Sequence, residues 1–157
     1  MNVKMLVMDV DGTLTDGRIY IGASGEMMKA FDVKDGYAIV HLREKGIEPV
    51  IITGRSSAIV QERAKELGIT ELYQGVNDKL QQLKFVAQKL DCQSDEIAYI
   101  GDDVNDIDCI ENCGVTGCPN DAVDIVRDKV KYICRNNGGR GAVREFIDYI
   151  IDEIASI

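Results

Sequence analysis

Two carboxylates stand one residue apart where an apolar stretch of the chain ends. Residues 3–8 are apolar except for Lys4, which is typical of a buried strand, and Asp9 and Asp11 follow directly. Side chains at i and i+2 of a strand share a face, so these charges repel unless a cation relieves them. Mg²⁺ prefers carboxylate and carbonyl oxygen, and the pair therefore indicates a magnesium site. The alternative is an ordinary turn, because Asp and Gly are common turn residues.

Two further apolar stretches, residues 48–52 and 96–100, also end in polar residues. Their polar signatures are Thr53-Gly54-Arg55 and Gly101-Asp102-Asp103. Ligands of a doubly wound sheet bind beyond the carboxyl ends of its strands, so all three signatures are expected at one edge. Lys79 stands at the start of a predicted helix, from which its ammonium group can reach the same edge.

These groups suit phosphoryl transfer. One carboxylate can attack phosphorus to form an aspartyl-phosphate, and a second can protonate the leaving oxygen and later activate water. Mg²⁺ offsets the repulsion between nucleophile and phosphate, while a lysine, a hydroxyl and backbone N–H groups hold the transferring oxygens. The one histidine, His41, lies within a predicted helix, which leaves no competing Ser-His or Cys-His nucleophile.

Apolar strands alternate with amphipathic helices along the whole sequence. Expected strands are residues 3–8, 48–52, 72–73 and 96–100. Expected helices begin at Asp32 or Asp35, at Ser56 or Ser57, after Asp78 and after Asp103, and a last one covers residues 142–154. This alternation predicts an α/β fold: a doubly wound, Rossmann-like parallel sheet with helices on both faces. With no linker or repeat, residues 1–157 are expected to form a single domain.

A β-hairpin is predicted between the first strand and the first helix, from residues 18–21, a turn at 22–25 and residues 26–31. Its exposed face would carry Ile19, Ile21, Met27 and Met28. A two-stranded hairpin is marginal alone, and this one is too apolar to project freely into water. We therefore predict that it packs against another subunit.

Composition narrows the classes of partner. The net charge of −9 argues against nucleic acid, although local cations and Mg²⁺ still permit a small phosphate ester. No apolar run approaches the roughly 20 residues that span a bilayer, and no secretory signal pattern is recognisable. Five cysteines without a CxxC pair are expected to be reduced thiols. A cytoplasmic protein that binds neither membrane nor nucleic acid is predicted.

The polar signatures together resemble the four motifs of the haloacid dehalogenase superfamily of phosphotransferases. In chain order they are Asp9-Val10-Asp11-Gly12-Thr13, Thr53, Lys79 and Gly101-Asp102-Asp103-Val104-Asn105-Asp106. The resemblance implies that Asp9 is the nucleophile and Asp11 the general acid and base. Thr53, Gly54 and Lys79 would bind the phosphate.

The same resemblance implies how Mg²⁺ is held. Asp9 and Asp102 would bind the ion by their side chains, and Asp11 by its carbonyl oxygen. Asp103 and Asp106 would orient the water ligands and the lysine.

Longer segments are similar to the family of 3-deoxy-D-manno-octulosonate 8-phosphate phosphatases. They are Thr15-Asp16-Gly17, Phe31-Asp32-Val33-Lys34-Asp35-Gly36-Tyr37, Ile52-Thr53-Gly54-Arg55, Leu72-Tyr73-Gln74-Gly75 and Gly138-Gly139-Arg140-Gly141-Ala142-Val143-Arg144-Glu145. That family is capless and tetrameric, and its neighbouring subunits help to cover each active site. The resemblance implies a capless homotetramer with the hairpin at its core. The commonest role of that family is the biosynthesis of lipopolysaccharide precursors.

The family resemblance also implies contacts to the sugar acid, from Asp32, Val33, Lys34, Asp35, Gly36, Arg55 and Arg63. The planar fork of an arginine suits a carboxylate, whereas the alternative for Arg63 is an exposed helix charge. Val40 stands where family members often carry an arginine, which leaves the identity of the sugar open. The segment from Gly138 to Gly141 is either a plain loop or a mobile tail near a neighbour's active site.

The predicted function is Mg²⁺-dependent hydrolysis of 3-deoxy-D-manno-octulosonate 8-phosphate through an aspartyl-phosphate. The nearest alternative is a phosphatase that acts on a sialic-acid-type 9-phosphate. Phosphatases of that kind can carry an acidic residue at the position of Arg55. A catalytically silent tetramerisation module, related to domains fused to nucleotide-sugar synthetases, is an alternative from another class. A phosphoprotein phosphatase is disfavoured, because subunits packed over the cleft would exclude large substrates.

Overall fold

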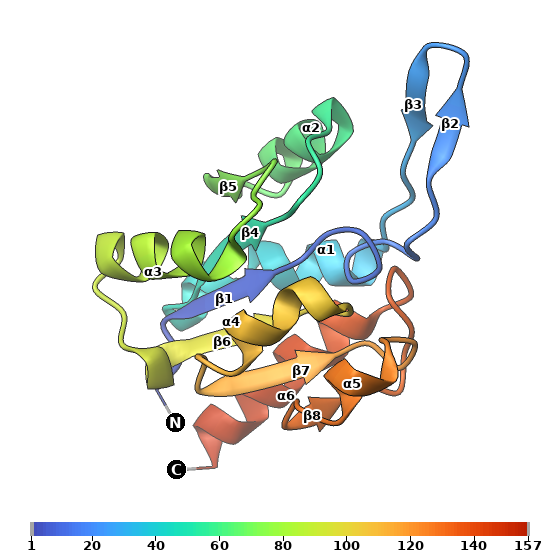
Figure 1. Cartoon of the computed structure of the whole chain (residues 1–157). Coiled ribbons are helices and arrows are strands. Elements are labelled where there is room, and N and C mark those ends of the chain that lie inside the picture. Colours follow the sequence, from blue (N-terminus) through green and yellow to red (C-terminus); the bar gives the residue numbers. More distant parts are fainter. Residues whose placement is uncertain (1, 157) are drawn as a thin grey trace.

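A six-stranded parallel sheet forms the centre of the computed structural model, which describes residues 2–156 (Figure 1). The strand order is β5-β4-β1-β6-β7-β8, so that β1 lies between β4 and β6. The strands are β1 (Met5–Met8), β4 (Glu48–Ile52), β5 (Glu71–Tyr73), β6 (Ile97–Ile100), β7 (Val115–Cys118) and β8 (Tyr132–Ile133). Val7 in β1 is in register with Val50 and Tyr99, which aligns the carboxyl ends of the three central strands.

Helices cover both faces of the sheet, which confirms the predicted doubly wound α/β fold (Figure 1). Alternate residues of β1 enter two separate cores: Leu6 and Met8 on one face, Met5 and Val7 on the other. The first core packs against α1 (Val33–Val40), α2 (Ala58–Glu66) and α6 (Ala142–Ala155). The second packs against α3 (Lys79–Lys89), α4 (Ile107–Ile110) and α5 (Asp124–Arg127).

Side-chain caps begin the helices that follow the strand ends. Each cap oxygen accepts a backbone N–H of the first turn, which satisfies a donor that the helix itself leaves unpaired. The caps are Asp32 (from Lys34 and Asp35), Ser57 (from Val60) and Asp78 (from Gln81). The structure thus selects Asp32 over Asp35 and Ser57 over Ser56, and it confirms Asp78.

Two predicted helices are shorter than expected. The first ends at Val40, and a 3₁₀ helix, η1 (Leu42–Lys45), completes the segment before Gly46 turns the chain at φ 74°. The helix expected after Asp103 is divided into η3 (Val104–Asp106) and α4, because the carboxylates of Asp103 and Asp106 cap a tight turn. A further 3₁₀ helix, η2 (Ser94–Glu96), precedes β6.

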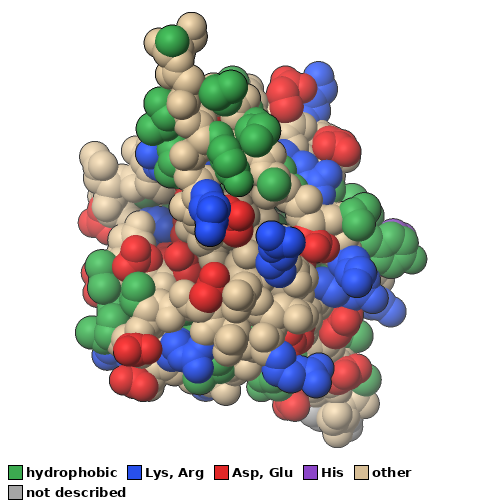
Figure 2. Space-filling model, turned by 90° about the vertical axis from the view of Figure 1, so that its right-hand side faces the viewer, with side chains coloured by type: hydrophobic (Ala, Val, Ile, Leu, Met, Phe, Trp, Pro, Cys, Tyr) green, Lys and Arg blue, Asp and Glu red, His purple; other side chains and the backbone are tan. Residues whose placement is uncertain are grey.

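The predicted hairpin is present as β2 (Tyr20–Gly22) and β3 (Gly25–Met28), which project away from the sheet (Figure 1). Its apolar side chains are largely exposed in the single chain, Ile21 at 71% and Met27 at 67%. Figure 2 shows them gathered on the projection, above the face that carries the carboxyl ends of the strands. These exposed apolar groups are the feature on which the predicted packing against another subunit rests.

The glycine-rich segment before α6 packs against its own chain. Gly139 donates its N–H to Thr13 O (3.1 Å), and Gly138 donates its N–H to an Asp121 carboxylate oxygen (2.9 Å). A Cβ on Gly138 would lie 2.0 Å from Gly12 O, so only glycine allows this approach. Within the single chain, residues 138–141 therefore form a loop that is held against the loop that follows β1.

The helices of the chain are short or amphipathic, and its cysteines are unpaired. Between residues 2 and 156 there is no helix with the length and apolarity that a membrane crossing requires. All five cysteines are free thiols, and every one except Cys113 is buried. Burial raises the pKa of the Cys109 thiol to about 12, so it stays protonated and unreactive.

Candidate active site

The carboxyl ends of β1, β4 and β6 meet at one cleft. A hollow of about 190 Å³ is lined by Asp9, Asp11, Thr53, Gly54, Arg55, Asp102, Asp103 and Asn105. The three polar signatures of the sequence therefore come together, as the parallel sheet requires. Asn105 joins them because the tight turn of η3 bends the chain back toward the strand ends.

Three of these carboxylates form a compact acidic cluster. Asp9, Asp102 and Asp106 each place an oxygen within 4.8 Å of the other two. Gly12 makes the approach possible, since a Cβ there would lie 1.9 Å from an Asp102 carboxylate oxygen. Oxygen atoms from several carboxylates at this spacing are the donors that Mg²⁺ prefers, so the cluster fits the predicted ion.

Lys79 supplies the one ammonium group inside this cluster, as far as residues 2–156 show. Its Nζ donates to an Asp9 oxygen (2.9 Å) and to an Asp106 oxygen (2.8 Å), and the residue is only 4% exposed. The cap at Asp78 starts α3 at this point and so directs Lys79 toward the strand ends. Asp106 is held further by the Tyr99 hydroxyl, which donates to the same oxygen (2.6 Å).

The charges of the cluster do not balance. Burial, reinforced by the neighbouring carboxylates, raises the pKa of Asp9 and of Asp102. Burial opposes the charge of Lys79, yet the attraction of Asp9 and Asp106 prevails and raises its pKa. The cluster thus holds three carboxylates and one ammonium group, which contacts only Asp9 and Asp106, and a divalent cation would relieve the remaining repulsion.

Asp11 also lines the cleft and is close to two cations other than Lys79. Lys29 Nζ donates to Asp11 Oδ1 (2.5 Å), and Arg55 Nε lies 3.9 Å from Asp11 Oδ2. Arg55 was expected here, but sequence reasoning missed Lys29. In the sequence, Lys29 is a single lysine that follows the apolar residues Met27 and Met28 at the end of a predicted strand. Such a pattern is too common to indicate a site.

Thr53 and Gly54 occupy the turn that ends β4. Thr53 is 2% exposed, its N–H donates to Tyr73 O (3.0 Å), and its carbonyl accepts from Val76 N (3.1 Å). This backbone pairing fixes the turn beside Asp9 and leaves Gly54 lining the cleft.

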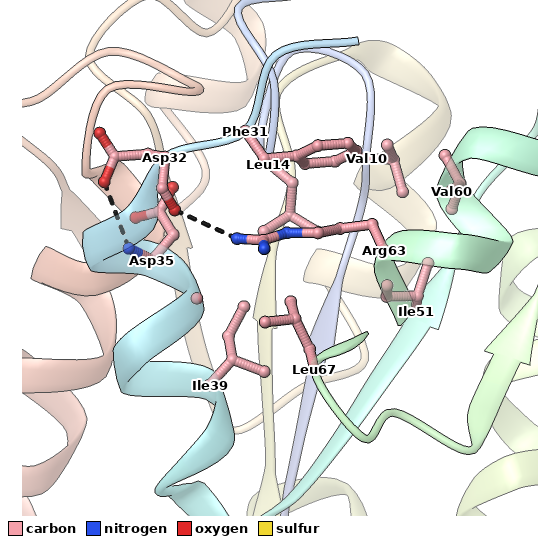
Figure 3. A pocket seen from close by; sticks show the side chains of 11 residues that line it. Val10, Leu14, Phe31, Asp32, Asp35, Ile39, Ile51, Val60, Arg63 and Leu67 are labelled. Carbon is pink, nitrogen blue, oxygen red and sulfur yellow. Dashed lines mark hydrogen bonds between the residues drawn. The ribbon is translucent and has the colours of Figure 1, made fainter. Parts of the chain in front are cut away.

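Most of the predicted sugar contacts do not line this cleft. Of the set Asp32, Val33, Lys34, Asp35, Gly36, Arg55 and Arg63, only Arg55 does. The others lie on or beside α1 and α2, and Figure 3 shows Asp32, Asp35 and Arg63 around a separate small cavity of about 10 Å³. Gly36 closes one wall, since a Cβ there would lie 2.5 Å from an Arg63 nitrogen.

Asp35 and Arg63 have internal partners that keep them in place. Asp35 is 2% exposed, and its Oδ1 accepts the Arg144 N–H (2.8 Å), which ties α1 to the start of α6. The Arg63 guanidinium stacks over the Phe31 ring at 5.4 Å from its centroid (Figure 3). Across the described chain, Asp35 Oδ2 and Arg63 Nε find no hydrogen-bond partner, and a cavity of this size admits about one water molecule.

Burial of Asp35 predicts a measurable pH effect on stability. Burial raises its pKa from 3.8 to about 6, against the Arg144 N–H that lowers it. Between these pH values the folded chain holds a proton that the unfolded chain has lost, so stability falls as pH rises. Asn is neutral throughout. Relative to wild type, the unfolding free energy of Asp35→Asn should therefore rise by up to about 2 kcal/mol between pH 4 and pH 8.

Urea denaturation at the two pH values measures this difference. Asp128 is exposed, and Asp128→Asn is the matched control that should keep the wild-type pH slope. An Asp35→Asn variant with that same slope would show that Asp35 titrates normally.

The amino-acid sequence of this chain is similar to that of known hydrolases. A family model described as haloacid dehalogenase-like hydrolase matches residues 32–114. The 3-deoxy-D-manno-octulosonate 8-phosphate phosphatase KdsC of Yersinia pestis is 45% identical over 150 residues, which cover 96% of this chain and 80% of the relative. KdsC of Escherichia coli strain K12 is 43% identical over the same shares.

Solved structures of related phosphatases share the fold of this chain. The Yersinia pestis phosphatase superposes with a TM-score of 0.93, covering 96% of this chain and 81% of that one. The Moraxella catarrhalis phosphatase, solved with a magnesium ion, a phosphate ion and a KDO molecule, is 40% identical with a TM-score of 0.92, covering 98% and 92%. The cobalt-bound phosphatase of Haemophilus influenzae is 34% identical with a TM-score of 0.93, covering 96% and 88%. The chain therefore belongs to the haloacid dehalogenase-like hydrolases, among the relatives of the 3-deoxy-D-manno-octulosonate 8-phosphate phosphatases.

Proposed function

We propose that the protein is a Mg²⁺-dependent phosphatase that hydrolyses 3-deoxy-D-manno-octulosonate 8-phosphate. The observation that carries the proposal is the cluster of Asp9, Asp102 and Asp106 around Lys79, beside a cleft that Asp11 also lines. Identity of 43–45% to phosphatases named for this substrate supports the choice of sugar.

Asp9 is the nucleophile in this proposal. Its carboxylate attacks phosphorus and forms an aspartyl-phosphate, while Asp11 protonates the departing sugar oxygen. Asp11, now a carboxylate, then takes a proton from the water that hydrolyses the aspartyl-phosphate. Lys79 holds Asp9 by hydrogen bond and offsets part of the negative charge that gathers there.

The acidic cluster is the proposed metal site. Asp9 and Asp102 would hold Mg²⁺ by their side chains and Asp11 by its carbonyl oxygen, with Asp103 orienting water ligands. When bound, the ion supplies positive charge that lessens repulsion between the nucleophile and the phosphate. Asp106 accepts the N–H groups of Asp102 and Asp103 (3.0 and 3.2 Å) and so keeps this loop in the geometry that the ion needs.

The substrate would enter with its phosphate at the turn of Thr53 and Gly54. Arg55, whose side chain is 52% exposed, is placed to pair with the carboxylate of the sugar acid. The exposed Val33 and Lys34 lie outside this cleft, and we propose that they reach a substrate in the cleft of a neighbouring chain. Asp35, Gly36 and Arg63 would then support that surface from beneath.

We propose that four copies assemble around the projecting hairpin. The exposed Ile21 and Met27 support this arrangement, because burial of such a ribbon stabilises it. Sedimentation velocity of the single-domain chain, residues 1–157, should give a tetramer, and a monomer would contradict the proposal. The reduced thiols further support a cytoplasmic enzyme, and the substrate suggests lipopolysaccharide precursor synthesis.

Phosphate release from two sugar esters tests the function. With Mg²⁺, 3-deoxy-D-manno-octulosonate 8-phosphate should be hydrolysed well, and the sialic-type 9-phosphate at least about tenfold more slowly. Excess EDTA should abolish both activities, and Mg²⁺ should restore them. Preference for the 9-phosphate would overturn the choice of sugar alone, whereas no release from either ester would favour a silent assembly module.

Val40 is the one residue that weighs toward a different sugar. It is 43% exposed on α1 and does not line the cleft, so its own chain loses no cation there. Arg55 lines the cleft where a sialic-type relative can carry an acidic residue, so the eight-carbon substrate remains the better proposal.

A further inference from the structure

Lys29 is a buried cation at the root of the hairpin. It follows β3 directly, and its side chain is only 1% exposed. Nζ lies 2.5 Å from Asp11 Oδ1 and 2.9 Å from Glu26 Oε1. Both acids are themselves partly covered, with side chains 20% and 18% exposed. A lysine at this depth stays in one place, because leaving would strip two carboxylates of their partner.

Hydrogen bonds connect this ion pair to the start of α2. Ser57 Oγ donates to Glu26 Oε2 (2.6 Å), and Ser57 N donates to the Gln74 side-chain oxygen (2.9 Å). Ser57 is also the N-cap of α2, the helix that follows the turn of Thr53 and Gly54. The contacts therefore link the hairpin, the loop after β1 and the start of α2. We refer to Lys29, Glu26 and Ser57 as the polar latch.

We propose that Lys29 is a positioning residue for Asp11, and that the polar latch makes the root of the hairpin part of the active site. This inference rests on the proposed function, in which Asp11 exchanges a proton with the leaving oxygen. Lys29 fixes Oδ1 and leaves Oδ2 directed toward Arg55, which lines the cleft. Oδ2 is therefore the atom that carries the proton to the sugar oxygen.

Arg55 cannot do this positioning in place of Lys29. Its Nε is 3.9 Å from Asp11 Oδ2, beyond hydrogen-bond distance, and its side chain is 52% exposed. Lys29 in turn is too buried to bind substrate, because its side chain is only 1% exposed and its Nζ already pairs with two carboxylates. The two cations thus have separate roles: Lys29 positions the carboxyl group of Asp11, and Arg55 is available to bind the substrate.

Leaving-group dependence provides the test. A general acid matters most when the departing oxygen is a poor leaving group, such as a sugar alcohol, and little for p-nitrophenolate. Lys29→Met keeps the stem and removes the charge. We expect kcat/KM for the sugar phosphate to fall about 100-fold and for p-nitrophenyl phosphate less than about fivefold. Lys29→Arg should recover most of the difference, and Lys84→Met, at an exposed lysine of α3, should match wild type.

Two results would overturn the inference: an equal loss on both esters, which indicates general damage to the site, or no loss on either. A measurement without substrate separates this from failure of the proposed function. In urea denaturation, the effects of Lys29→Met and Asp11→Asn should not be additive, because the residues share one ion pair. Additive changes in unfolding free energy would contradict the polar latch even if the enzyme is active. Non-additive changes in a chain without phosphatase activity would support the latch and reject only the proposed chemistry.

Discussion

Asp9→Asn should lower phosphate release by roughly 10⁵-fold or more, since loss of a nucleophile removes the covalent route entirely. The amide keeps the shape of the side chain but cannot attack phosphorus. Folding should survive, because burial already disfavours the charge of Asp9 and raises its pKa. Residual turnover above about a hundredth of wild type would reject Asp9 as the nucleophile.

The measurement needs a control for contaminating phosphatases and for nonspecific effects of the substitution. Asp128→Asn changes an exposed aspartate that does not line the cleft and should keep wild-type activity. Trapping of a labelled acyl-phosphate after rapid acid quench should succeed with wild type and fail with Asp9→Asn. Labelled phosphate found on the Asp9→Asn variant would place the covalent step elsewhere.

Lys79→Met should destabilise the fold by about 3–5 kcal/mol, because it leaves buried carboxylates without their cation. Asp9 and Asp106 lose bonds of 2.9 and 2.8 Å, and neither has another ammonium partner among the described residues. Activity should fall with it, since Lys79 holds the nucleophile. Chemical denaturation of Lys79→Met and of Lys84→Met, an exposed lysine in the same helix, measures the difference. Equal midpoints for the two variants would contradict this account.

The pH dependence has a definite sign. The pKa of Lys79 is raised in the folded chain, so its contribution is complete below the ordinary value of 10.5 and lost only as pH rises through the folded one. Lys79→Met removes that contribution at neutral pH. In the variant, Asp9 and Asp106 are buried at lower cost when they are protonated, and protonation is favoured at low pH. Relative to wild type, the variant should therefore lose less unfolding free energy at pH 5 than at pH 8. Added Mg²⁺ should offset part of the loss at pH 8.

The sequence was sufficient to predict four of the six strands, the cap at Asp78 and the grouping of polar residues at the strand ends, whereas the short strands β7 and β8 were not singled out and the caps of α1 and α2 were each left between two residues. Each depends on local patterns: apolar runs ending in Asp9, Thr53 and Asp102, and cap residues such as Asp78 ahead of amphipathic helices. Parallel strands then leave one edge where those ends can meet. The hairpin followed from turn residues between short apolar runs.

Contacts that depend on three-dimensional packing could not be read from those patterns. Lys29 reaches Asp11 only because the hairpin folds back, over a separation of 18 residues. Asp35 resembled a helix cap or a ligand contact, but the start of α6, 109 residues later, covers it and takes its Oδ1. Long-range burial of this kind has no periodic signal in a single sequence.

The turn at Gly138 and Gly139 affects when the active-site loop can fold during synthesis on the ribosome. The loop that carries Asp9 and Asp11 is synthesised first, yet its bracing contact at Thr13 waits for Gly139. β1 likewise lies between strands made later, β4 and β6. A nascent chain ending before residue 138 can therefore present the acidic loop without its support. Catalytic competence should appear only late in translation, after the chain has delivered that turn.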